Sequence, residues 1–446
     1  MPSTQPLAYT ALDRSTQSFR LIEVLPGDSQ QISCKFHIHQ VGANAACPPF
    51  TALSYTWGPP DSTSLIIIDN QSFPVRKNLW SALSSYRKKI NDGTFRGLLW
   101  VDAVCINQQD TRERSHQVNM MDAIFSQANT VLVWLGPEED DSSRVLEYIR
   151  TMPSLDYEKD QGPPSSYARL LPKPEYQGIQ FVIPKPDFTI DDLFQELFDQ
   201  QLDQAFLALF QRAYWTRMWI VQEVLLAKNL VILCGDQLCD WSTMVSIASD
   251  LLYLGRFLGL DGLPVDKFSN TQISTARLRH LQSQIVGSPA YYILTKGMDS
   301  SRLQQREAGW EIRELIQTWY QQECADPRDR VYALLGLSRG EIRADYDKTL
   351  EDVFGDVVTS QRPEMSDQDY ATFVTALTKA LYLDPPPEKI EDLGRIAGID
   401  LEDELGYVRE IMLIGPKWPS EQDHTAEDGA SPALPVKSFN VTTYGF

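Results

Sequence analysis

Apolar and polar residues alternate in two stretches near the start of the chain, at residues 18–25 and 31–41. Strict alternation places the apolar side chains on one face of a half-buried strand. A turn containing Pro26, Gly27 and Asp28 separates the two stretches, so the pattern predicts a β-hairpin.

Three shorter strands are predicted next. Residues 50–57 form the first of them, which ends at a Gly-Pro-Pro sequence. Residues 65–68 form a short apolar strand, and residues 69–71 are turn formers that send the chain back into a strand at residues 72–75. The front of the chain is therefore predicted to consist mainly of strands.

Helices and strands alternate farther along the chain. Asn78 can cap a helix, and residues 98–104 form an apolar run with one aspartate, which suits a strand buried in a parallel sheet. Asp110 and Glu113 have the spacing of a capping box and begin one helix with a continuous apolar stripe. Residues 131–135 form another buried strand. This alternation predicts an α/β core.

Helices dominate the second half of the chain. Residues 191–227 are predicted to be helical, in two pieces that meet near Tyr214 and Trp215, and residues 230–234 form one more strand. Amphipathic helices are predicted near residues 241–257, 272–285, 307–321 and 327–336.

These patterns divide the chain into four regions. We expect an N-terminal hairpin extension at residues 1–47, an α/β domain at residues 48–240, a helical extension at residues 241–361, and an acidic region at residues 362–446 whose tail is partly disordered. Residues 153–190 hold seven prolines and no periodic segment, so they are predicted to be an insertion into the α/β domain.

The chain of 446 residues is acidic, with 40 basic and 60 acidic side chains and a formal net charge of -20. Phosphate recognition depends on lysine and arginine, so this balance argues against nucleic-acid binding. The N-terminus lacks the apolar core of a signal peptide, and no apolar run reaches the length of a membrane span. We therefore expect a cytoplasmic protein.

Several well-known site motifs are missing from the sequence. The six cysteines include no C-x-x-C pair, so buried or free thiols are favoured over a metal site. The chain also lacks a G-x-S-x-G sequence, a Walker loop and a dinucleotide-binding fingerprint.

Three groups of aromatic and polar residues stand out, and the first is Ser54, Tyr55 and Trp57. These residues lie where a predicted strand ends, at the edge of the predicted sheet. They are either part of a site at that edge or the end of a strand with a packing tryptophan.

The second group is Asp102, with Cys105, Asn107 and Gln108. Asp102 lies toward the carboxyl end of a predicted buried strand, and ligands bind just beyond such ends in open parallel sheets. The alternative is that Asp102 caps a loop amide and that the two amide side chains shape the turn.

The third group is Trp215, Trp219, Gln222 and Glu223, which share one face of a predicted helix. A carboxylate in apolar surroundings has a raised pKa unless a cation or donor compensates. Such a group is typical of a catalytic acid and also of a structural ion pair. Arg212 and Arg217 are available for the ion pair, and both interpretations stay open.

Three motifs in this order resemble the HET (heterokaryon incompatibility) domain of filamentous fungi. The first motif is ALSYTWG at residues 52–58, the second is LWVDAVCINQQDTRERSHQVNMMDAIFSQANTVLVWLG at residues 99–136, and the third is YWTRMWIVQEVLLA at residues 214–227. The sequence DPRDRVYALLGLS at residues 326–338 is also typical of proteins that carry this domain. The domain pattern covers roughly residues 50–236.

The resemblance implies a role in allorecognition and innate immunity, in which fusion of incompatible fungal cells triggers programmed cell death. HET domains have been compared with TIR domains, which are flavodoxin-like modules that signal by assembly or cleave NAD. The implied fold is an α/β, flavodoxin/TIR-like parallel sheet core with an N-terminal β-hairpin and a mostly helical C-terminal region. Two molecular activities stay open: an NAD glycohydrolase, and a non-catalytic signalling or assembly module that acts through protein–protein contacts.

The similarity to TIR enzymes also implies a catalytic residue. Their catalytic glutamate follows a tryptophan in a helix, and the sequence from Trp219 to Glu223 looks similar. The Glu223 carboxylate would stabilise the oxocarbenium-like state that forms when the nicotinamide–ribose bond breaks, and Trp57 or Trp219 would stack on nicotinamide or adenine. The substrate-binding residues would be Ser54, Tyr55, Trp57, Asp102, Asn107, Gln108, Arg217, Trp219 and Gln222.

On this interpretation the protein requires no cofactor and no metal, and NAD is its candidate substrate. The candidate partners are a nucleotide substrate, a second copy of the chain, and an allelic or upstream activator protein. Neither nucleic acid nor a membrane span is expected.

Overall fold

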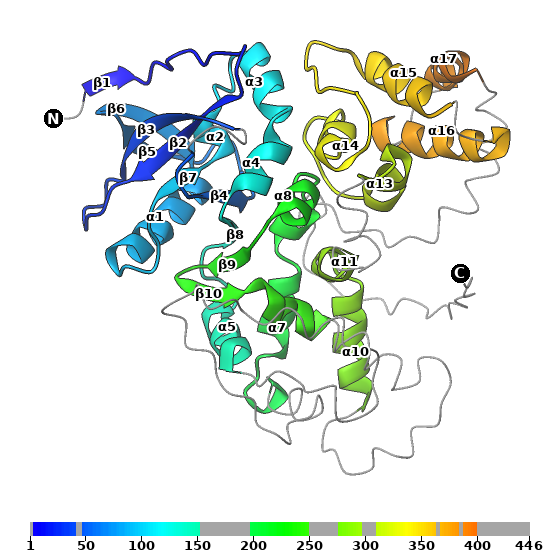
Figure 1. The fold of residues 1–446 in the computed structure, drawn as a ribbon. Helices are drawn as coiled ribbons and strands as arrows, with labels where there is room; N and C mark the ends of the chain where they lie inside the picture. Colours follow the sequence, from blue (N-terminus) through cyan, green and yellow to red (C-terminus); the bar gives the residue numbers. More distant parts are fainter. Residues whose placement is uncertain are drawn as a thin grey trace.

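The computed structural model describes residues 3–41, 47–151, 197–248, 275–296, 309–362, 366–382 and 387–398. Within these ranges the strands form one mixed sheet of ten strands, and a group of helices lies beside it (Figure 1). The predicted insertion at residues 153–190 and the predicted C-terminal tail lie outside the described residues. Among the described residues, no helix combines the length and the apolar content that crossing a bilayer requires.

The predicted hairpins are confirmed. Strands β2 (Ser18–Val24) and β3 (Ser33–Gln40) pair antiparallel along their whole length. Strands β5 (Thr63–Ile68) and β6 (Gln71–Arg76) also pair antiparallel, and the turn between them is the dipeptide Asp69-Asn70. Both turn residues have positive φ, 48° and 66°, as a two-residue hairpin turn of the I′ type requires.

The parallel core consists of β7 (Leu98–Trp100), β4 (Phe50–Tyr55), β8 (Thr130–Gly136) and β9 (Leu230–Cys234), in that spatial order. In chain order these neighbours read 2-1-3-4, which is the order of flavodoxin-like sheets. The hairpin strand β2 joins the core through an antiparallel contact with β7. The predicted α/β class, with a hairpin added to a parallel core, is therefore confirmed.

The two edges of the sheet are short strands. Strand β1 (Ser3–Pro6) pairs parallel with β6 at one edge. Strand β10 (Gln237–Asp240) folds back antiparallel on β9 at the other edge, and Gly235 in the intervening turn has a φ of 55°.

Helices cover both faces of the parallel core. Helix α1 (Lys77–Asn91) packs on one face, where the indole nitrogen of Trp134 on β8 donates to Asn78. Helix α4 (Met121–Gln127) packs on the other face, where its Phe125 ring meets the Trp100 ring edge-on at 5.3 Å. Because strand side chains alternate between faces, neighbouring residues at one strand end serve different layers.

Two sequence predictions about local structure are wrong. The strand predicted at residues 98–104 ends at Trp100, and Asp102 begins the short helix α2 (Asp102–Cys105). Asn78 does not cap α1, because its side chain donates to the Thr56 carbonyl and accepts from Trp134 instead. For Asn78, tertiary partners outweigh the local capping preference.

The predicted capping box is half confirmed. The Asp110 carboxylate accepts from the backbone amides of Arg112 and Glu113, so it does cap α3 (Thr111–Val118). The Glu113 side chain, however, turns away toward Arg20. The single helix predicted here is also two helices, because the chain breaks at Asn119 between α3 and α4.

The second half of the described chain is mostly helical, as predicted, and the 3-10 turn η2 lies at the predicted break near Tyr214. One apolar core joins β8 and β9 with helices from α5 to α17. The elements are α5 (Ser142–Thr151), α7 (Asp203–Phe210), η2 (Ala213–Thr216), α8 (Ile220–Leu226), α10 (Thr275–Val286), α11 (Pro289–Lys296), α13 (Ile312–Trp319), α14 (Asp329–Tyr332), η4 (Leu335–Leu337), α15 (Leu350–Gln361), α16 (Asp367–Tyr382) and α17 (Pro387–Ala397).

A buried ion pair attaches the N-terminal hairpin to the second motif. Arg20 on β2 is 1% exposed, and its guanidinium donates to both carboxylate oxygens of Glu113 on α3, at 2.5 and 3.1 Å. The same guanidinium donates to the carbonyls of Cys105 and Thr10. The hairpin is therefore tied to α3 by a pair in which each partner compensates the other's buried charge.

Arg20→Leu is expected to destabilise the protein by about 3–5 kcal/mol, because it leaves the Glu113 carboxylate buried without a cation. Urea unfolding of the full chain measures this loss. The double variant Arg20→Met, Glu113→Leu removes both charges and is expected to recover part of it. A double variant less stable than Arg20→Leu would contradict this account of the pair.

Candidate functional site

The candidate site lies at the carboxyl end of β4, where the first motif ends. Ser54 and Tyr55 are the last two residues of this strand, and their side chains point to opposite faces of the sheet. Ser54 faces the helix that carries the third motif, whereas Tyr55 lies beside Asp102 of the second motif. Two polar clusters therefore meet at this edge.

The first cluster joins Ser54 to the third motif. The Ser54 hydroxyl donates to Oε2 of Glu223, and its oxygen lies 2.8 Å from the hydroxyl oxygen of Tyr214. Nη1 of Arg217 lies 3.6 Å from the same Oε2, which is an ion-pair distance longer than a normal hydrogen bond. Glu223 is only 3% exposed, so its carboxylate is shielded from solvent, whereas the Arg217 side chain is partly exposed.

Burial dominates the electrostatics of this cluster. It raises the pKa of Glu223 above the ordinary value of a glutamate, and the nearby Asp102 charge adds to the rise. The Arg217 charge and the Ser54 hydrogen bond act in the opposite direction because they stabilise the carboxylate. Burial, followed by the Glu223 charge, also raises the pKa of Tyr214.

The second cluster surrounds Asp102. The indole nitrogen of Trp57 donates to Oδ2 of Asp102 at 2.8 Å, and the backbone amide of Ala103 donates to Oδ1 at 2.6 Å. Burial and the Asp102 carboxylate raise the pKa of Tyr55 well above its usual value. The guanidinium carbon of Arg76 lies over the Trp57 ring, 5.1 Å from its centroid. Asp102 therefore fixes the indole while Arg76 covers one of its faces.

Asn107 and Gln108 shape the turn after α2. The Gln108 amide donates to the backbone carbonyl of Asp102 at 2.9 Å. The Asn107 side-chain oxygen accepts from the backbone amide of Gln109 at 3.3 Å. The structure thus brings these two residues near Asp102 but gives their amides backbone partners.

Trp219 and Gln222 face away from the Ser54 cluster. The Trp219 indole nitrogen donates to Oδ2 of Asp329 at 3.0 Å. The Gln222 amide, oriented by its surroundings, donates to the Ala333 carbonyl at 3.1 Å and accepts from the Asp122 backbone amide at 3.0 Å. Both predicted binding residues therefore contact structural partners, and only Glu223 of this helix face reaches Ser54.

Comparison with known proteins agrees with this arrangement of the motifs. Residues 50–223 match the model of the heterokaryon incompatibility protein (HET) family. This chain carries a HET domain. It is 27% identical over 330 residues to heterokaryon incompatibility protein 6, OR allele, of Neurospora crassa, a stretch that covers 69% of this chain and 46% of the relative. The chain thus spans about half the length of that relative, and no solved structure matches it.

The resemblance to the HET family is therefore confirmed, and the limits of the match have a structural meaning. The HET match begins at Phe50, the first residue of β4, and ends at Glu223. Both ends thus belong to the segments that the Ser54–Glu223 hydrogen bond joins.

The sequence interpretation missed Tyr214 and Arg76 as site residues. Tyr214 lies within the third motif, so its position beside the Trp-Thr-Arg-Met-Trp sequence was the available signal. Arg76 ends the β5–β6 hairpin, far from any motif, and no pattern in the sequence marks it. Only the fold brings its guanidinium to the HET domain's Trp57.

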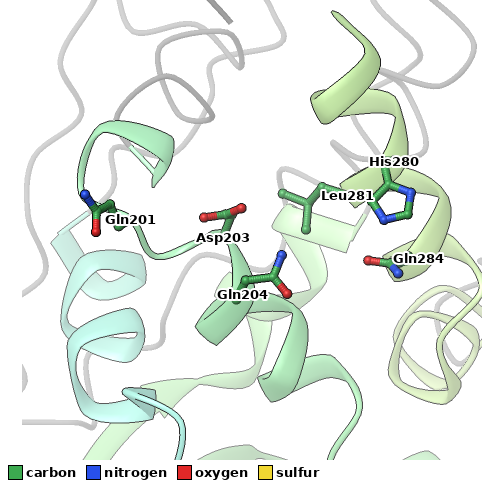
Figure 2. Close-up of a pocket in the computed structure, with 6 residues that line it drawn as sticks. All are labelled: Gln201, Asp203, Gln204, His280, Leu281 and Gln284. Atoms are coloured by element: carbon green, nitrogen blue, oxygen red, sulfur yellow. The ribbon is translucent and has the colours of Figure 1, made fainter. Parts of the chain in front are cut away.

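A separate pocket of about 590 Å³ lies between α7 and α10 (Figure 2). In that view Asp203 and Gln204 of α7 face His280 and Gln284 of α10 across the opening. The pocket is lined by Gln201, Asp203, Gln204, His280, Leu281 and Gln284, none of which belongs to the predicted site. The residues from α7 and the turn before it lie within the HET match, whereas the residues from α10 follow it.

Arg217→Met is expected to destabilise the HET domain more at pH 8 than at pH 5. Without the cation, burial raises the pKa of Glu223 further above its ordinary value. A carboxyl whose folded-state pKa is raised stabilises the fold at low pH, and this contribution is lost as the pH rises through that pKa. Urea unfolding should show a loss of about 2–4 kcal/mol at pH 8 and a smaller loss at pH 5.

The double variant Arg217→Met, Glu223→Gln is the control, because an uncharged amide has no titration in this range. Its stability relative to the wild type is expected to vary less with pH than that of Arg217→Met. Equal losses for Arg217→Met at both pH values would show that Arg217 does not stabilise the Glu223 charge.

Proposed function

We propose that this protein is a fungal heterokaryon-incompatibility protein that triggers programmed cell death in allorecognition, and that its HET domain does so by cleaving NAD. The HET match and the similarity to heterokaryon incompatibility protein 6 support the biological role. One observation carries the molecular activity: Glu223 is buried at the carboxyl end of a parallel strand, bound by Ser54 and faced by Arg217. Ligands of open α/β sheets bind at such ends.

The proposed reaction is hydrolysis of the nicotinamide–ribose bond. The bond between C1′ of the ribose and the pyridinium nitrogen breaks, and nicotinamide leaves with the electron pair. Water then adds to C1′ and releases one proton, which gives ADP-ribose. The positive charge that develops on the ribose is stabilised by an anionic carboxylate close to it, the role proposed for Glu223.

The surrounding residues suit a carboxylate that must stay ionised. Burial raises the pKa of Glu223, whereas the Arg217 charge and the Ser54 hydroxyl lower it and so favour the anion. Trp57, held by Asp102, offers an aromatic edge next to this site. Because Glu223 is 3% exposed, a substrate reaches it only after this edge opens. We assign that opening to activation by an allelic or upstream partner protein, or by self-association.

A second candidate function is a non-catalytic signalling module. The ion pair between Arg217 and the buried Glu223 favours this function, because an ion pair that only stabilises the fold has the same geometry. In that case the HET domain acts through protein–protein contacts, and the Ser54–Glu223 network only stabilises the fold.

Glu223→Gln is expected to reduce NAD cleavage by about 100-fold or more, because the amide keeps the size of the side chain but removes its charge. Chromatography of the nucleotides after incubation with the purified, concentrated full chain measures this loss. Glu314→Gln on the exposed face of α13 is the matched control and should cleave NAD at the wild-type rate.

The outcomes separate the two candidates. Wild-type turnover by Glu223→Gln would remove Glu223 from the reaction. A wild-type chain that self-associates and kills a fungal host, yet leaves every nucleotide intact, would favour the signalling module. Survival of the host with the wild-type chain would contradict the cell-death role itself.

A further inference from the structure

The helix that carries Glu223 is too short to be stable without tertiary contacts. Helix α8 has seven residues, and isolated helices of this length are not stable in water. Its place is therefore set by what it packs against. Besides Ser54 of β4, α8 contacts α4 of the second motif and a segment that follows the HET match, residues 322–346.

The start of this segment pairs with the backbone just before α8. The Met218 amide donates to the Glu323 carbonyl at 2.8 Å, and the Glu323 amide donates to the Thr216 carbonyl at 2.6 Å. The Gln322 side chain adds a hydrogen bond to the Trp215 carbonyl at 2.9 Å. These contacts form a parallel bridge beside Arg217, the cation that faces Glu223.

Asp329 makes the side-chain contact to α8. Its two carboxylate oxygens accept from the Trp219 indole at 3.0 Å and from the Tyr346 hydroxyl at 2.6 Å. Burial raises the pKa of Asp329 to about 6, so the carboxylate is held at an energetic cost. Trp219 lies one helical turn before Glu223, so a shift of this indole moves the catalytic candidate as well.

The other end of the segment is fixed to the second motif. The guanidinium carbon of Arg114 on α3 lies 3.8 Å from the centroid of the Tyr346 ring, and Ser115 accepts from the Tyr346 backbone amide. The Asn119 side chain both donates to and accepts from the Ala344 backbone. The segment thus connects α3 of the second motif to α8 of the third motif.

Close packing at Gly336 also connects the segment to α8. A Cβ atom on Gly336 would lie 2.6 Å from Cβ of Asp122 on α4 and 2.8 Å from the Gln222 side chain on α8. Only a glycine fits where α4, α8 and η4 meet, so their spacing is fixed to within the width of a methyl group. The segment therefore leaves α8 little freedom.

We propose that residues 322–346 complete the HET site, and that Asp329 is a positioning residue that sets where α8 holds Glu223. This role rests on the proposed function where NAD cleavage is the readout. A purely structural contact at this place needs no carboxylate, since an apolar side chain of similar size fills the space without a buried charge. The hydrogen bond from Tyr346 instead orients the Asp329 carboxylate, and the hydrogen bond from Trp219 to that carboxylate fixes the angle of the indole ring and with it the rotation of α8.

The test uses three variants of the full chain. Asp329→Ala removes both acceptors. Asp329→Asn keeps the geometry, because its amide oxygen accepts from Trp219 and its amide nitrogen donates to the Tyr346 hydroxyl. Asp347→Ala, at an exposed aspartate of the same loop, is the control.

Asp329→Ala is expected to lower kcat by about 10–100-fold with little change in KM, because the carboxylate is displaced while the other binding residues stay. Amide hydrogen exchange in α8 should rise by about tenfold or more, with exchange in the β-sheet unchanged. Asp329→Asn should restore both kcat and protection, and Asp347→Ala should match the wild type. If Asp329→Ala fails to fold, Trp219→Phe removes only the donor and should show the same two effects.

Three results would overturn the proposal. The first is a wild-type kcat in Asp329→Ala despite faster amide exchange in α8. The second is a kcat of Asp329→Ala above that of the wild type, which would indicate an inhibitory contact. The third is unchanged amide exchange in α8 of Asp329→Ala. If the wild type does not cleave NAD, the proposed function fails separately, and the exchange measurement alone decides whether Asp329 positions α8.

Discussion

A buried carboxylate needs a cation or hydrogen-bond donors beside it, and this requirement connects the three HET motifs to each other and to the segments that flank them. Glu223 of α8 lies beside the carboxyl end of β4 and is 3% exposed. Its ionised form is therefore stabilised by the Ser54 hydroxyl and by Arg217 rather than by water. Ser54 belongs to the first motif, and the other two residues belong to the third. The compensation therefore holds together segments that are separated by more than half of the HET domain.

A carboxylate with polar partners also connects distant segments at two other places in the fold. Glu113 is compensated by Arg20, which attaches the N-terminal hairpin to the second motif. Asp329 accepts hydrogen bonds from Trp219 and Tyr346, which attaches the C-terminal extension to the third motif. Each of these carboxylates thus joins two parts of the chain that are distant in the sequence. Directed polar contacts fix registers and angles, whereas apolar contacts mainly fix proximity.

This arrangement changes how the parts of the chain relate to each other. The HET match ends at Glu223, yet the helix carrying that residue is packed between α4 and residues 322–346. One apolar core runs from β8 through α8 to the helices that follow. A property of the HET domain, catalytic or not, is therefore expected to depend on the helical extension as well as on the three motifs.

Sequence patterns predicted the features that are local. Alternation along the chain predicted the first hairpin, and turn-forming residues predicted the second. The apolar runs at β7 and β8 predicted a parallel core that the structure confirms. The HET motifs were also visible in the sequence, and the family match bears them out. These features depend on residues a few positions apart, where turn chemistry and side-chain period decide the outcome.

Only the tertiary structure decided the partners of the polar side chains. Helical period predicted that Trp219, Gln222 and Glu223 share a face, but that face meets Asp329 and Ala333 as well as Ser54. Asn78 and Glu113 likewise have strong local capping preferences, and each instead bonds to a residue far away in the chain. Which donor meets which acceptor depends on how distant segments pack. A buried charge takes the partner that the completed fold brings within reach, and no local period encodes that choice.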